Sequence, residues 1–438
     1  MLDKLKEIIL TNQVSVLELG IKRELEIIAI PGKATICMGV RRSGKSTYMR
    51  QLLQGLLEQG IARENTVHIN FFDNRLHNLQ HTNLEIIIEA YYSIYPDKKN
   101  LQKVYYFFDE IQEIDGWETF VERLMRSGNS EVYITGSSAK MLSKEIATQM
   151  RGRSLSWEMF PFSFAEYLSC NGISFAENMT SRDRLLVEKT FFEYFAVGSF
   201  PEVAKLPQNL RVKIHQEYFN TILFRDLIER YNIKSPQSVI DTAYWLINNT
   251  ACTYTINSLT GYLKSLGHKI TKNTIGEYLD WFEDAYFIFS VRIFDTSLSR
   301  ANANPKKIYC IDHALVTSVA DGILVNSGHL LESLIFITLR RLTEKIYYYR
   351  TKNGREVDFV AIINNRAKLL IQVCESLADP KKLKRETTAI NETMLELGLD
   401  SGIIVTLKED QKIEVSAGIV LVIPAWKFLL YLDTFLPR

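Results

Sequence analysis

The chain has 438 residues, of which 46% are hydrophobic and 24% charged, the proportions of a globular protein with room for about two to four domains. A net charge of +1 gives no overall basic surface for a nucleic acid, and no apolar run reaches the roughly 18–20 residues that cross a bilayer. The five cysteines lack C-x-x-C spacing, which argues against a cysteine-based zinc site and indicates reduced thiols in a cytoplasm. Residues 1–7 begin a mixed-charge helix and do not read as a secretion signal.

The first motif is a glycine-rich loop that follows a buried strand. Residues 34–38 are an apolar run, and residues 39–46 read Gly-Val-Arg-Arg-Ser-Gly-Lys-Ser, a complete G-x-x-x-x-G-K-[ST] motif. The glycines let backbone N–H groups surround phosphates, Lys45 reaches the β- and γ-phosphates, and Ser46 offers a hydroxyl to Mg²⁺. A helix predicted over about 47–59 points its positive end at the anion. The motif predicts binding of a nucleoside triphosphate through Gly39, Arg42, Ser43, Gly44, Lys45, Ser46 and Thr47.

A strand that ends in two carboxylates follows at residues 104–110. Beside a phosphate loop, Asp109 is placed to hold the Mg²⁺ shell and Glu110 to orient the attacking water. An Asp-Glu pair at a strand end is by itself more typical of a helix cap. The upstream loop, with the strand-like residues 66–72 between the two motifs, favours the catalytic pair.

Two further strands complete the pattern of an α/β fold. The strand at 132–138 ends on hydroxyls, of which Thr135 and Ser137 either sense the γ-phosphate and its water or form an ordinary polar turn; the spacing leaves both readings open. A fifth strand fits residues 154–159. Strands that alternate with helical stretches predict a parallel sheet with helices on both faces and a ligand at the carboxyl ends of the strands.

Transfer of a phosphoryl group needs a further cation, for which the chain offers several arginines. Arg153, in the Arg-Gly-Arg sequence 151–153 just before the fifth strand, is the best-placed candidate. Any single one of these arginines is more typically a solvated surface residue, and the sequence does not choose among them. The alternatives are Arg41, Arg42, Arg123, Arg126 and Arg151.

Residues 161–300 are predicted to hold two helical segments. Residues 161–235 are helical and aromatic-rich with a loop at 197–201, and a Ser-Pro pair at 235–236 breaks the chain. Residues 236–300 follow the pattern of a winged helix: helices near 239–248 and 256–266, a third helix that begins after a threonine cap, and a strand at 286–293.

The third helix of this segment begins after Thr271 or Thr274 and carries four acids on its predicted free face. A helix that reads DNA places that face against phosphates, which acids repel. The pattern therefore favours a protein partner over the DNA major groove. The four acids are Glu277, Asp280, Glu283 and Asp284.

The last segment, 301–438, carries a different constellation. Glu332 lies on a predicted helix at 330–340, Asp358 on a strand, and Gln372 on a strand one hairpin later. A helix Glu, a strand Asp and a (Glu/Gln)-x-Lys strand form the skeleton of restriction-endonuclease-like metal sites, where carboxylates gather Mg²⁺ and the lysine helps to activate water. Here the lysine position is Cys374, and Lys368 is the one substitute nearby.

The missing lysine favours a degenerate site over a working nuclease. Residues 340–385 nevertheless hold twelve Lys and Arg against five Asp and Glu, a local basic bias compatible with a phosphate backbone. DNA therefore stays a possible partner of this segment.

Together these motifs resemble a family of bacterial and archaeal ATPases that join an AAA-type P-loop core to a C-terminal region long catalogued as a domain of unknown function. The resemblance runs from about residue 20 to about residue 410. Its motifs are the phosphate loop, Phe-Asp-Glu-Ile-Gln (108–112), Thr-Gly-Ser-Ser (135–138), Arg-Gly-Arg (151–153), Phe-Pro-Phe-Ser-Phe (160–164), Gly-Ser-Phe-Pro-Glu (198–202), Arg-Asp-Leu (225–227), Tyr-Cys-Ile-Asp (309–312), Arg-Glu-Val-Asp-Phe (355–359) and Gln-Val-Cys (372–374).

The resemblance implies an ASCE-type P-loop ATPase, a winged-helix middle and a nuclease-like end. It assigns Lys45 and Ser46 to phosphate and Mg²⁺, Asp109 to Mg²⁺, Glu110 to water, and Thr135 or Ser137 to sensing of the γ-phosphate. ATP is expected over GTP because of the resemblance and because the chain has no Asn-Lys-x-Asp tetrad that reads guanine.

The sequence as a whole predicts an ATPase core at 1–160 with an N-terminal helix, a helical connector at 161–235, a winged-helix-like domain at 236–300 and a degenerate restriction-endonuclease-like α/β domain at 301–438. The expected activity is Mg²⁺-dependent hydrolysis of ATP to ADP and phosphate, coupled to movement of the C-terminal domains. The alternatives are an ATP-controlled DNA nuclease and a slow or non-hydrolysing nucleotide switch. We expect a cytoplasmic protein without a membrane segment.

Overall fold

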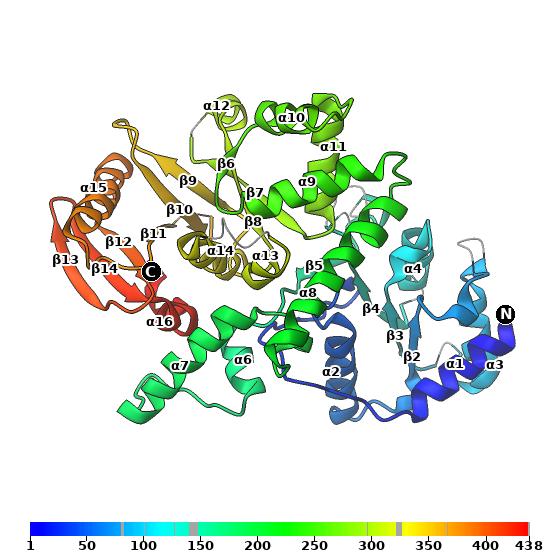
Figure 1. Cartoon of the computed structure of the whole chain (residues 1–438). Coiled ribbons are helices and arrows are strands. Elements are labelled where there is room, and N and C mark those ends of the chain that lie inside the picture. Colours follow the sequence, from blue (N-terminus) through cyan, green and yellow to red (C-terminus); the bar gives the residue numbers. More distant parts are fainter. Residues whose placement is uncertain are drawn as a thin grey trace. The chain divides into compact units, whose positions relative to one another are not determined.

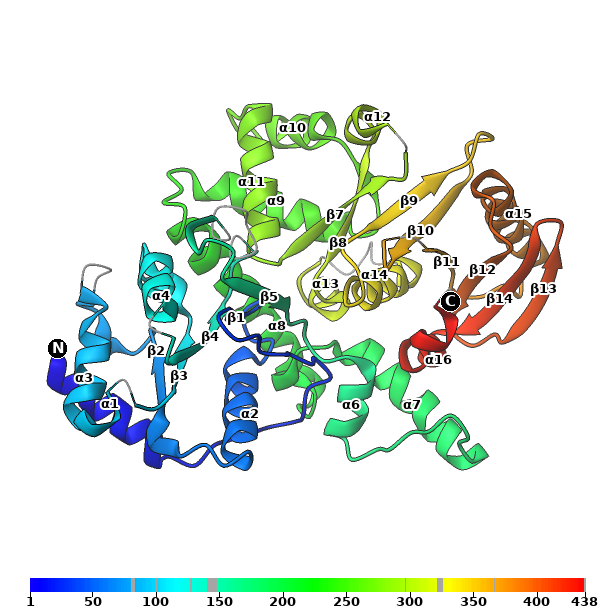
Figure 2. The same cartoon turned by 180° about the vertical axis from the view of Figure 1, so that it is seen from behind.

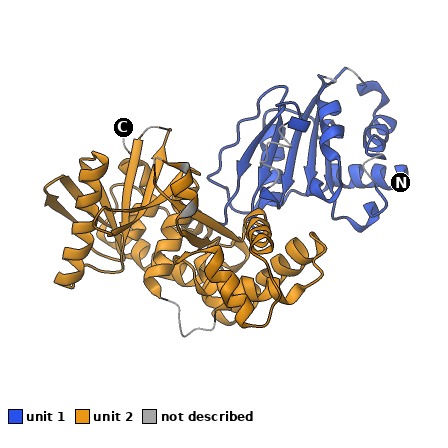
Figure 3. Ribbon diagram, turned by 90° about the horizontal axis from the view of Figure 1, so that it is seen from above, with its two compact units in different colours: residues 1–161 blue, residues 162–438 orange. Residues whose placement is uncertain are grey.

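The computed structural model describes residues 1–79, 83–99, 101–126, 128–139, 148–295, 297–320, 326–365 and 367–436. The chain forms two compact units, Met1–Pro161 and Phe162–Arg438, which Figure 3 colours separately. The predicted boundaries after residues 160, 235 and 300 stay predictions, and the first of them lies one residue from this division. Within the described ranges, every helix is too short or too polar to serve as a membrane span.

Unit 1 is built on a parallel five-stranded sheet (Figure 1). The strand order is β2-β3-β4-β1-β5, and all neighbouring strands are parallel. This order confirms the predicted P-loop α/β fold. The helices and strands of unit 1 are α1 (Leu2–Val14), β1 (Ala34–Met38), α2 (Lys45–Glu58), β2 (Thr66–Asn70), α3 (Ile86–Ile94), β3 (Val104–Asp109), α4 (Trp117–Arg126), β4 (Ser130–Gly136) and β5 (Ser154–Glu158).

Strand β3 shows why helices cover both faces of this sheet. Successive side chains of a strand point to opposite faces, and every residue of β3 is buried. Tyr105 and Phe107 belong to an apolar cluster with Met49 and Leu53 of α2. From the opposite face, Tyr106 contacts the ring of Tyr91 on α3, and Phe108 contacts that of Phe120 on α4. Both faces of β3 are therefore closed by helices, as the apolar run predicts.

Unit 2 contains a mixed nine-stranded sheet with the order β13-β14-β12-β11-β10-β9-β7-β8-β6 (Figure 2). Strand β7 pairs in parallel with β9, so strands from the predicted winged-helix segment and from the last segment share one sheet. Its strands are β6 (Thr253–Tyr254), β7 (Ile288–Ile293), β8 (Lys306–Cys310), β9 (Ile346–Arg350), β10 (Glu356–Ile363), β11 (Ala367–Val373), β12 (Ser401–Thr406), β13 (Gln411–Val415) and β14 (Gly418–Pro424).

The helices of unit 2 include a long π-helical turn that holds the Arg-Asp-Leu sequence 225–227. This π-helix, Ile222–Glu229, continues directly from α8. The helices are α6 (Phe164–Cys170), α7 (Ser181–Val197), α8 (Gln208–Thr221), α9 (Pro236–Asn248), α10 (Ile256–Ser265), α11 (Lys272–Asp284), α12 (Leu298–Ala303), α13 (His313–Val319), α14 (Ser327–Arg340), α15 (Pro380–Leu397) and α16 (Ala425–Leu430).

Helices α9, α10 and α11, strands β6 and β7 and the start of α12 lie in the segment in which a winged helix is predicted. Thr271 caps α11, because its hydroxyl accepts a hydrogen bond from the backbone N–H of Thr274 at 3.2 Å. The predicted free face of α11 needs a correction, since Asp284 is buried and accepts a hydrogen bond from Tyr231 Oη at 2.6 Å. Glu277 and Asp280 remain on the exposed face. The winged-helix assignment itself stays a prediction.

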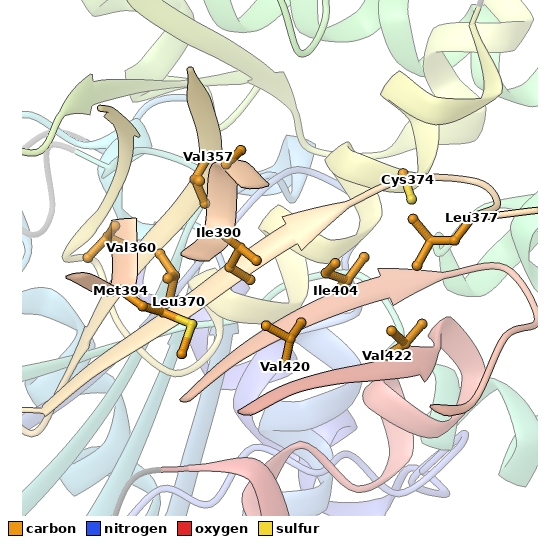
Figure 4. Close-up of a cluster of buried hydrophobic side chains, with 11 residues drawn as sticks. Val357, Val360, Leu370, Cys374, Leu377, Ile390, Met394, Ile404, Val420 and Val422 are labelled. Atoms are coloured by element: carbon orange, nitrogen blue, oxygen red, sulfur yellow. The ribbon is translucent and has the colours of Figure 1, made fainter. Parts of the chain in front are cut away.

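The C-terminal part of the large sheet packs on α15 through an apolar cluster, shown in Figure 4. Val357 and Val360 of β10 lie in it with Ile390 and Met394 of α15. Cys374, the residue at the position of the expected nuclease lysine, belongs to the same cluster. Burial raises the pKa of the Cys374 thiol to about 12, so this side chain is a neutral core residue.

Candidate active site

The phosphate loop connects β1 to α2 and depends on two glycines. A Cβ atom on Gly39 would lie 2.0 Å from the carbonyl oxygen of Met159, so any other residue collides with backbone. Gly44, the N-cap of α2, has a φ of 99°, a left-handed conformation that glycine adopts without strain. Arg42 also has a positive φ, 68°, which costs an ordinary residue about 1–3 kcal/mol. Backbone strain of this kind concentrates at ligand sites.

Lys45 lies inside the loop and not on its surface. Its side chain is 3% exposed, and Nζ donates hydrogen bonds to the carbonyls of Gly39 at 2.9 Å and Val40 at 3.1 Å. The same nitrogen lies 3.7 Å from Oε1 of Glu110. The ammonium is therefore held between the loop and the second predicted catalytic carboxylate.

The carboxyl ends of β3 and β4 meet beside the loop. Thr135 Oγ1 donates a short hydrogen bond to Asp109 Oδ1 and accepts one from the backbone N–H of Glu110 at 3.0 Å. Asp109 is 1% exposed and Glu110 7% exposed, although both are acids. Glu110 has a φ of 57°, a second strained backbone beside the loop. Lys45, Asp109, Glu110 and Thr135 therefore form one buried polar network.

Gln112 is a member of this network that the sequence analysis did not identify. Its Nε2 donates to Glu110 Oε2 at 2.5 Å and to Ser137 Oγ at 3.4 Å. A neutral amide carries no catalytic signal in a sequence, and the Phe-Asp-Glu-Ile-Gln motif was its one indication. Gln112 links the carboxylate predicted to orient water to the hydroxyl predicted to sense the γ-phosphate.

The donors around the loop fit a triphosphate with its magnesium ion. Ser43 Oγ is fully buried and has no hydrogen-bond partner among the described residues, an arrangement that calls for a ligand or water. The first N–H groups of α2, which begins at Lys45, have no acceptors within the helix. Ser46 and Thr47 lie half-buried in that first turn. Together with the Lys45 ammonium and the Asp109 carboxylate, these groups match phosphate and Mg²⁺ chemistry.

The structure does not place Arg153 near the other residues of the predicted ATP site. Its carbonyl accepts a hydrogen bond from the N–H of Ala34 at the start of β1, whereas the phosphate loop follows the other end of that strand. Five strand residues separate the two ends, a span of about 16 Å, which is longer than an arginine side chain. The prediction that Arg153 completes the site of its own chain is wrong, because parallel pairing with β1 places the start of β5 at the opposite edge of the sheet.

Arg23 is a second residue that the sequence analysis missed. It is 8% exposed, and its guanidinium donates to the carbonyls of Ser43 and Phe160, both at 2.7 Å. Gln51 of α2 binds the same segment, since its Nε2 donates to the carbonyl of Ile21 at 2.7 Å. Arg23 therefore ties the phosphate loop to the chain that follows β5. Its partners lie 20 and 137 residues away, so no local pattern marks it.

Replacing Arg23 with methionine should destabilise unit 1 by about 3 kcal/mol, because hydrogen bonds from a charged donor are lost and buried carbonyls are left unpaired. Chemical denaturation of the full chain, followed by tryptophan fluorescence, measures this change. Lys22→Met is the matched control, since Lys22 is exposed. Equal stability of the two variants would contradict the role of Arg23 as a tie.

The structure also brings together part of the predicted nuclease-like constellation. Glu332 of α14 and Asp358 of β10 both accept hydrogen bonds at 2.9 Å from one lysine, Lys307 of β8. Gln372 Oε1 accepts from the backbone N–H of Asp358 at 3.2 Å. Lys368, the expected substitute, lies instead with its ammonium 5.6 Å from the ring centroid of Phe294. The lysine of this cluster therefore comes from a strand that the sequence analysis did not consider.

Comparison with known protein families gives three consecutive matches. A model described as an AAA domain matches residues 31–168. Two models described as domains of unknown function, DUF8612 and DUF4143, match residues 188–323 and 327–428. The first match covers the phosphate loop and both carboxylates.

Two proteins are similar over most of their length. The uncharacterized protein MJ1544 of Methanocaldococcus jannaschii is 34% identical over 445 residues, which cover 98% of this chain and 96% of that protein. An uncharacterized protein of Haemophilus influenzae is 30% identical over 328 residues, which cover 74% of this chain and 78% of that protein.

Among solved structures, the Aeropyrum pernix ORC1 protein in complex with DNA aligns over 74% of this chain and 92% of its own chain. The identity is 11% and the TM-score 0.31, so this likeness is too distant to bear on function. The chain belongs to the family of MJ1544. In this chain, an AAA-type P-loop domain is followed by two domains of unknown function.

Proposed function

We propose that this protein binds ATP with Mg²⁺ and hydrolyses it to ADP and phosphate. The observation that supports the proposal best is the single buried network of Lys45, Asp109, Glu110 and Thr135 at the carboxyl edge of the parallel sheet. Ligands of open α/β sheets bind at this edge. The AAA domain match over residues 31–168 supports the same class of activity.

Each residue of the network has a role in this proposal. Lys45 exchanges the loop carbonyls for the β- and γ-phosphates and stabilises the charge that develops during transfer. Ser46 and Asp109 hold the Mg²⁺ that the nucleotide brings. Glu110 accepts the proton of the attacking water, and Gln112 fixes the direction of its carboxylate. Thr135 and Ser137 respond to the presence of the γ-phosphate.

We also propose that this cycle moves the domains of residues 162–438, which would act on a protein partner or on DNA. The five cysteines are all free thiols in the structure, in keeping with a place in the cytoplasm. A switch that binds ATP and hydrolyses little is the alternative within the same site. Such a switch would bind ATP as tightly as an ATPase does but would hydrolyse it far more slowly.

Removing magnesium provides the test of this proposal. Full-length protein should release phosphate from ATP, and addition of EDTA should abolish the release, since Asp109 acts through the metal. Steady-state phosphate release and equilibrium binding of a fluorescent ATP analogue are measured in parallel. Tight binding with turnover near the uncatalysed background would identify the switch. Absence of ATP binding at any Mg²⁺ concentration would refute the proposal.

A DNA nuclease is the second candidate, favoured by one observation. Lys307 supplies the positive charge that Cys374 cannot, 2.9 Å from both Glu332 and Asp358. The same lysine, however, stands between the carboxylates that would have to hold a metal ion. The position of Lys307 is therefore the point on which this candidate depends.

A further inference from the structure

Three carboxylates from two elements surround one ammonium group in unit 2. Nζ of Lys307 lies 2.9 Å from Glu332 Oε1 of α14, 2.9 Å from Glu356 Oε1 of β10 and 2.9 Å from Asp358 Oδ1 of β10. An ammonium has three N–H donors, and each of them here has its own carboxylate. The side chains of Lys307, Glu332 and Asp358 are 4%, 10% and 9% exposed.

The backbone is shaped to bring these groups together. The pairing of β10 with β9 shifts register between Val357 and Val360, which inserts one extra residue into β10 beside Asp358. A β-bulge of this kind re-aims a side chain and is common next to functional sites. Lys307 is buried in β8, whereas the adjacent Lys306 is half-buried and outside the cluster.

Other donors also reach these carboxylates. Tyr309 Oη donates to Glu332 Oε1 at 2.6 Å, and the backbone N–H of Val373 donates to Asp358 Oδ2 at 2.9 Å. Glu356 Oε2 accepts from Arg350 at 3.2 Å. Gln372 is engaged at both ends of its amide, because Oε1 accepts from the backbone N–H of Asp358 at 3.2 Å and Nε2 donates to Glu386 at 2.9 Å. Each of the three carboxylates therefore has a second donor besides the lysine.

The charges of the cluster favour a cation at its centre. Three carboxylates this close together, two of them buried, repel one another unless a cation lies among them, and the ammonium of Lys307 takes that place. Burial opposes the charge of Lys307, but the carboxylates of Asp358 and Glu332 outweigh it and raise the lysine pKa well above its ordinary value. Burial, followed by the Asp358 carboxylate, raises the pKa of Glu332 to about 7. The lysine stays protonated throughout the physiological range.

We propose that Glu332, Glu356 and Asp358 form a cation site whose resident cation is the ammonium of Lys307, and that this ammonium excludes divalent metal ions. Oxygen atoms lie about 2.1–2.6 Å from Mg²⁺ or Ca²⁺, so the three carboxylates would need to move inward by less than about 1 Å to bind such an ion in its place. As the carboxylates stand, they are spaced for an ammonium and not for a metal: in the described part of the chain, no group of three or more His, Cys, Asp and Glu side chains is arranged to hold a metal ion. The ammonium of Lys307 occupies the position that a metal ion would take among them.

This site is independent of the ATPase site in unit 1. With Lys307 in place this cluster binds no metal ion, so under the proposed function the divalent cation acts at the phosphate loop. A metal-dependent nuclease would instead have to expel or displace Lys307. Metal binding at this cluster therefore distinguishes a lysine-occupied cation site from a metal-dependent nuclease site.

The test exchanges Lys307 for methionine, which keeps the apolar stem of the side chain, ends one atom short of the ammonium position and removes the charge. Nucleotide-free full-length protein in an Asp109→Asn background, which removes the metal ligand at the phosphate loop, is titrated with Mn²⁺ and followed by electron paramagnetic resonance. We expect Lys307→Met to bind one Mn²⁺ per chain and the parent to bind none. At about a hundred times the Kd, Mn²⁺ should raise the Tm of Lys307→Met by about 5–10 °C and leave the parent unchanged.

Lys306→Met is the matched control and should behave as the parent. If Lys307→Met is too unstable to purify, its soluble yield is compared in growth medium with Mn²⁺ and in medium depleted of it; recovery with Mn²⁺ supports the proposal, and equal failure overturns it. The proposal is also overturned if the parent binds Mn²⁺ and loses it on Asp358→Asn, or if folded Lys307→Met binds no metal. Mn²⁺-dependent cleavage of DNA by the parent, abolished by Asp358→Ala, would establish the nuclease instead.

Discussion

Glu110→Gln should lower the steady-state turnover of ATP by about 10²–10⁴-fold, the range contributed by a positioned general base, and leave ATP affinity unchanged. Glutamine keeps the shape of the side chain but cannot accept the proton of the attacking water. Glu110 Oε1 lies 3.7 Å from Lys45 Nζ and Oε2 accepts from Gln112, so an uncharged amide still has neighbours in place. Phosphate release and binding of a fluorescent ATP analogue measure the two quantities separately.

Glu113→Gln is the control for this prediction. Glu113 lies in the same short helical turn, Ile111–Glu113, and is exposed, so its exchange alters the charge of the segment at its surface. We expect this variant to turn over ATP as the parent does. Similar turnover of Glu110→Gln and Glu113→Gln would exclude Glu110 as the general base.

Lys45→Ala should raise the Kd for ATP by about 100-fold or more, a loss of about 2.8 kcal/mol of binding free energy. The buried ammonium is held by two carbonyls of the phosphate loop, at 2.9 and 3.1 Å. Charge-assisted bonds from such a group to phosphate oxygens are about twice as strong as neutral ones. Isothermal titration calorimetry with ATP and Mg²⁺ measures the change.

The control for Lys45→Ala must separate binding from folding. Lys33→Ala removes a lysine next to the start of β1, at the edge of the sheet opposite the loop, and should bind ATP normally. Thermal unfolding of both variants shows whether the loop carbonyls left without Lys45 destabilise unit 1. Equal ATP affinity in the parent and in a folded Lys45→Ala variant would remove the basis of the proposed function.

The elements of the P-loop fold are predictable from the sequence because their signals are local. The apolar run 34–38 coincides with β1, and the run that ends in Asp109 coincides with β3. Each of these strands is recognised from a short apolar run and the motif that directly follows it. Predicted helix starts are less accurate: α2 begins at Lys45, so the motif lysine lies in the first helical turn and not before the helix.

The residues that the sequence analysis missed share a different property, since their partners are distant in the chain. Lys307 meets Glu332 and Asp358 across 25 and 51 residues, and Arg23 meets Phe160 across 137. No periodicity or spacing reports such contacts. The error at Arg153 has the same origin, because only the register of β5 on β1 shows which edge of the sheet its start occupies.

The pairing of β7 with β9 has a practical consequence for dividing this protein into fragments. A polypeptide cut at residue 300 would end inside one continuous hydrogen-bonded layer and leave β9 without its neighbour. Bare strand edges recruit other strands, so both halves would be prone to self-association. A fragment that starts at Phe162 keeps all nine strands of that sheet within a single polypeptide.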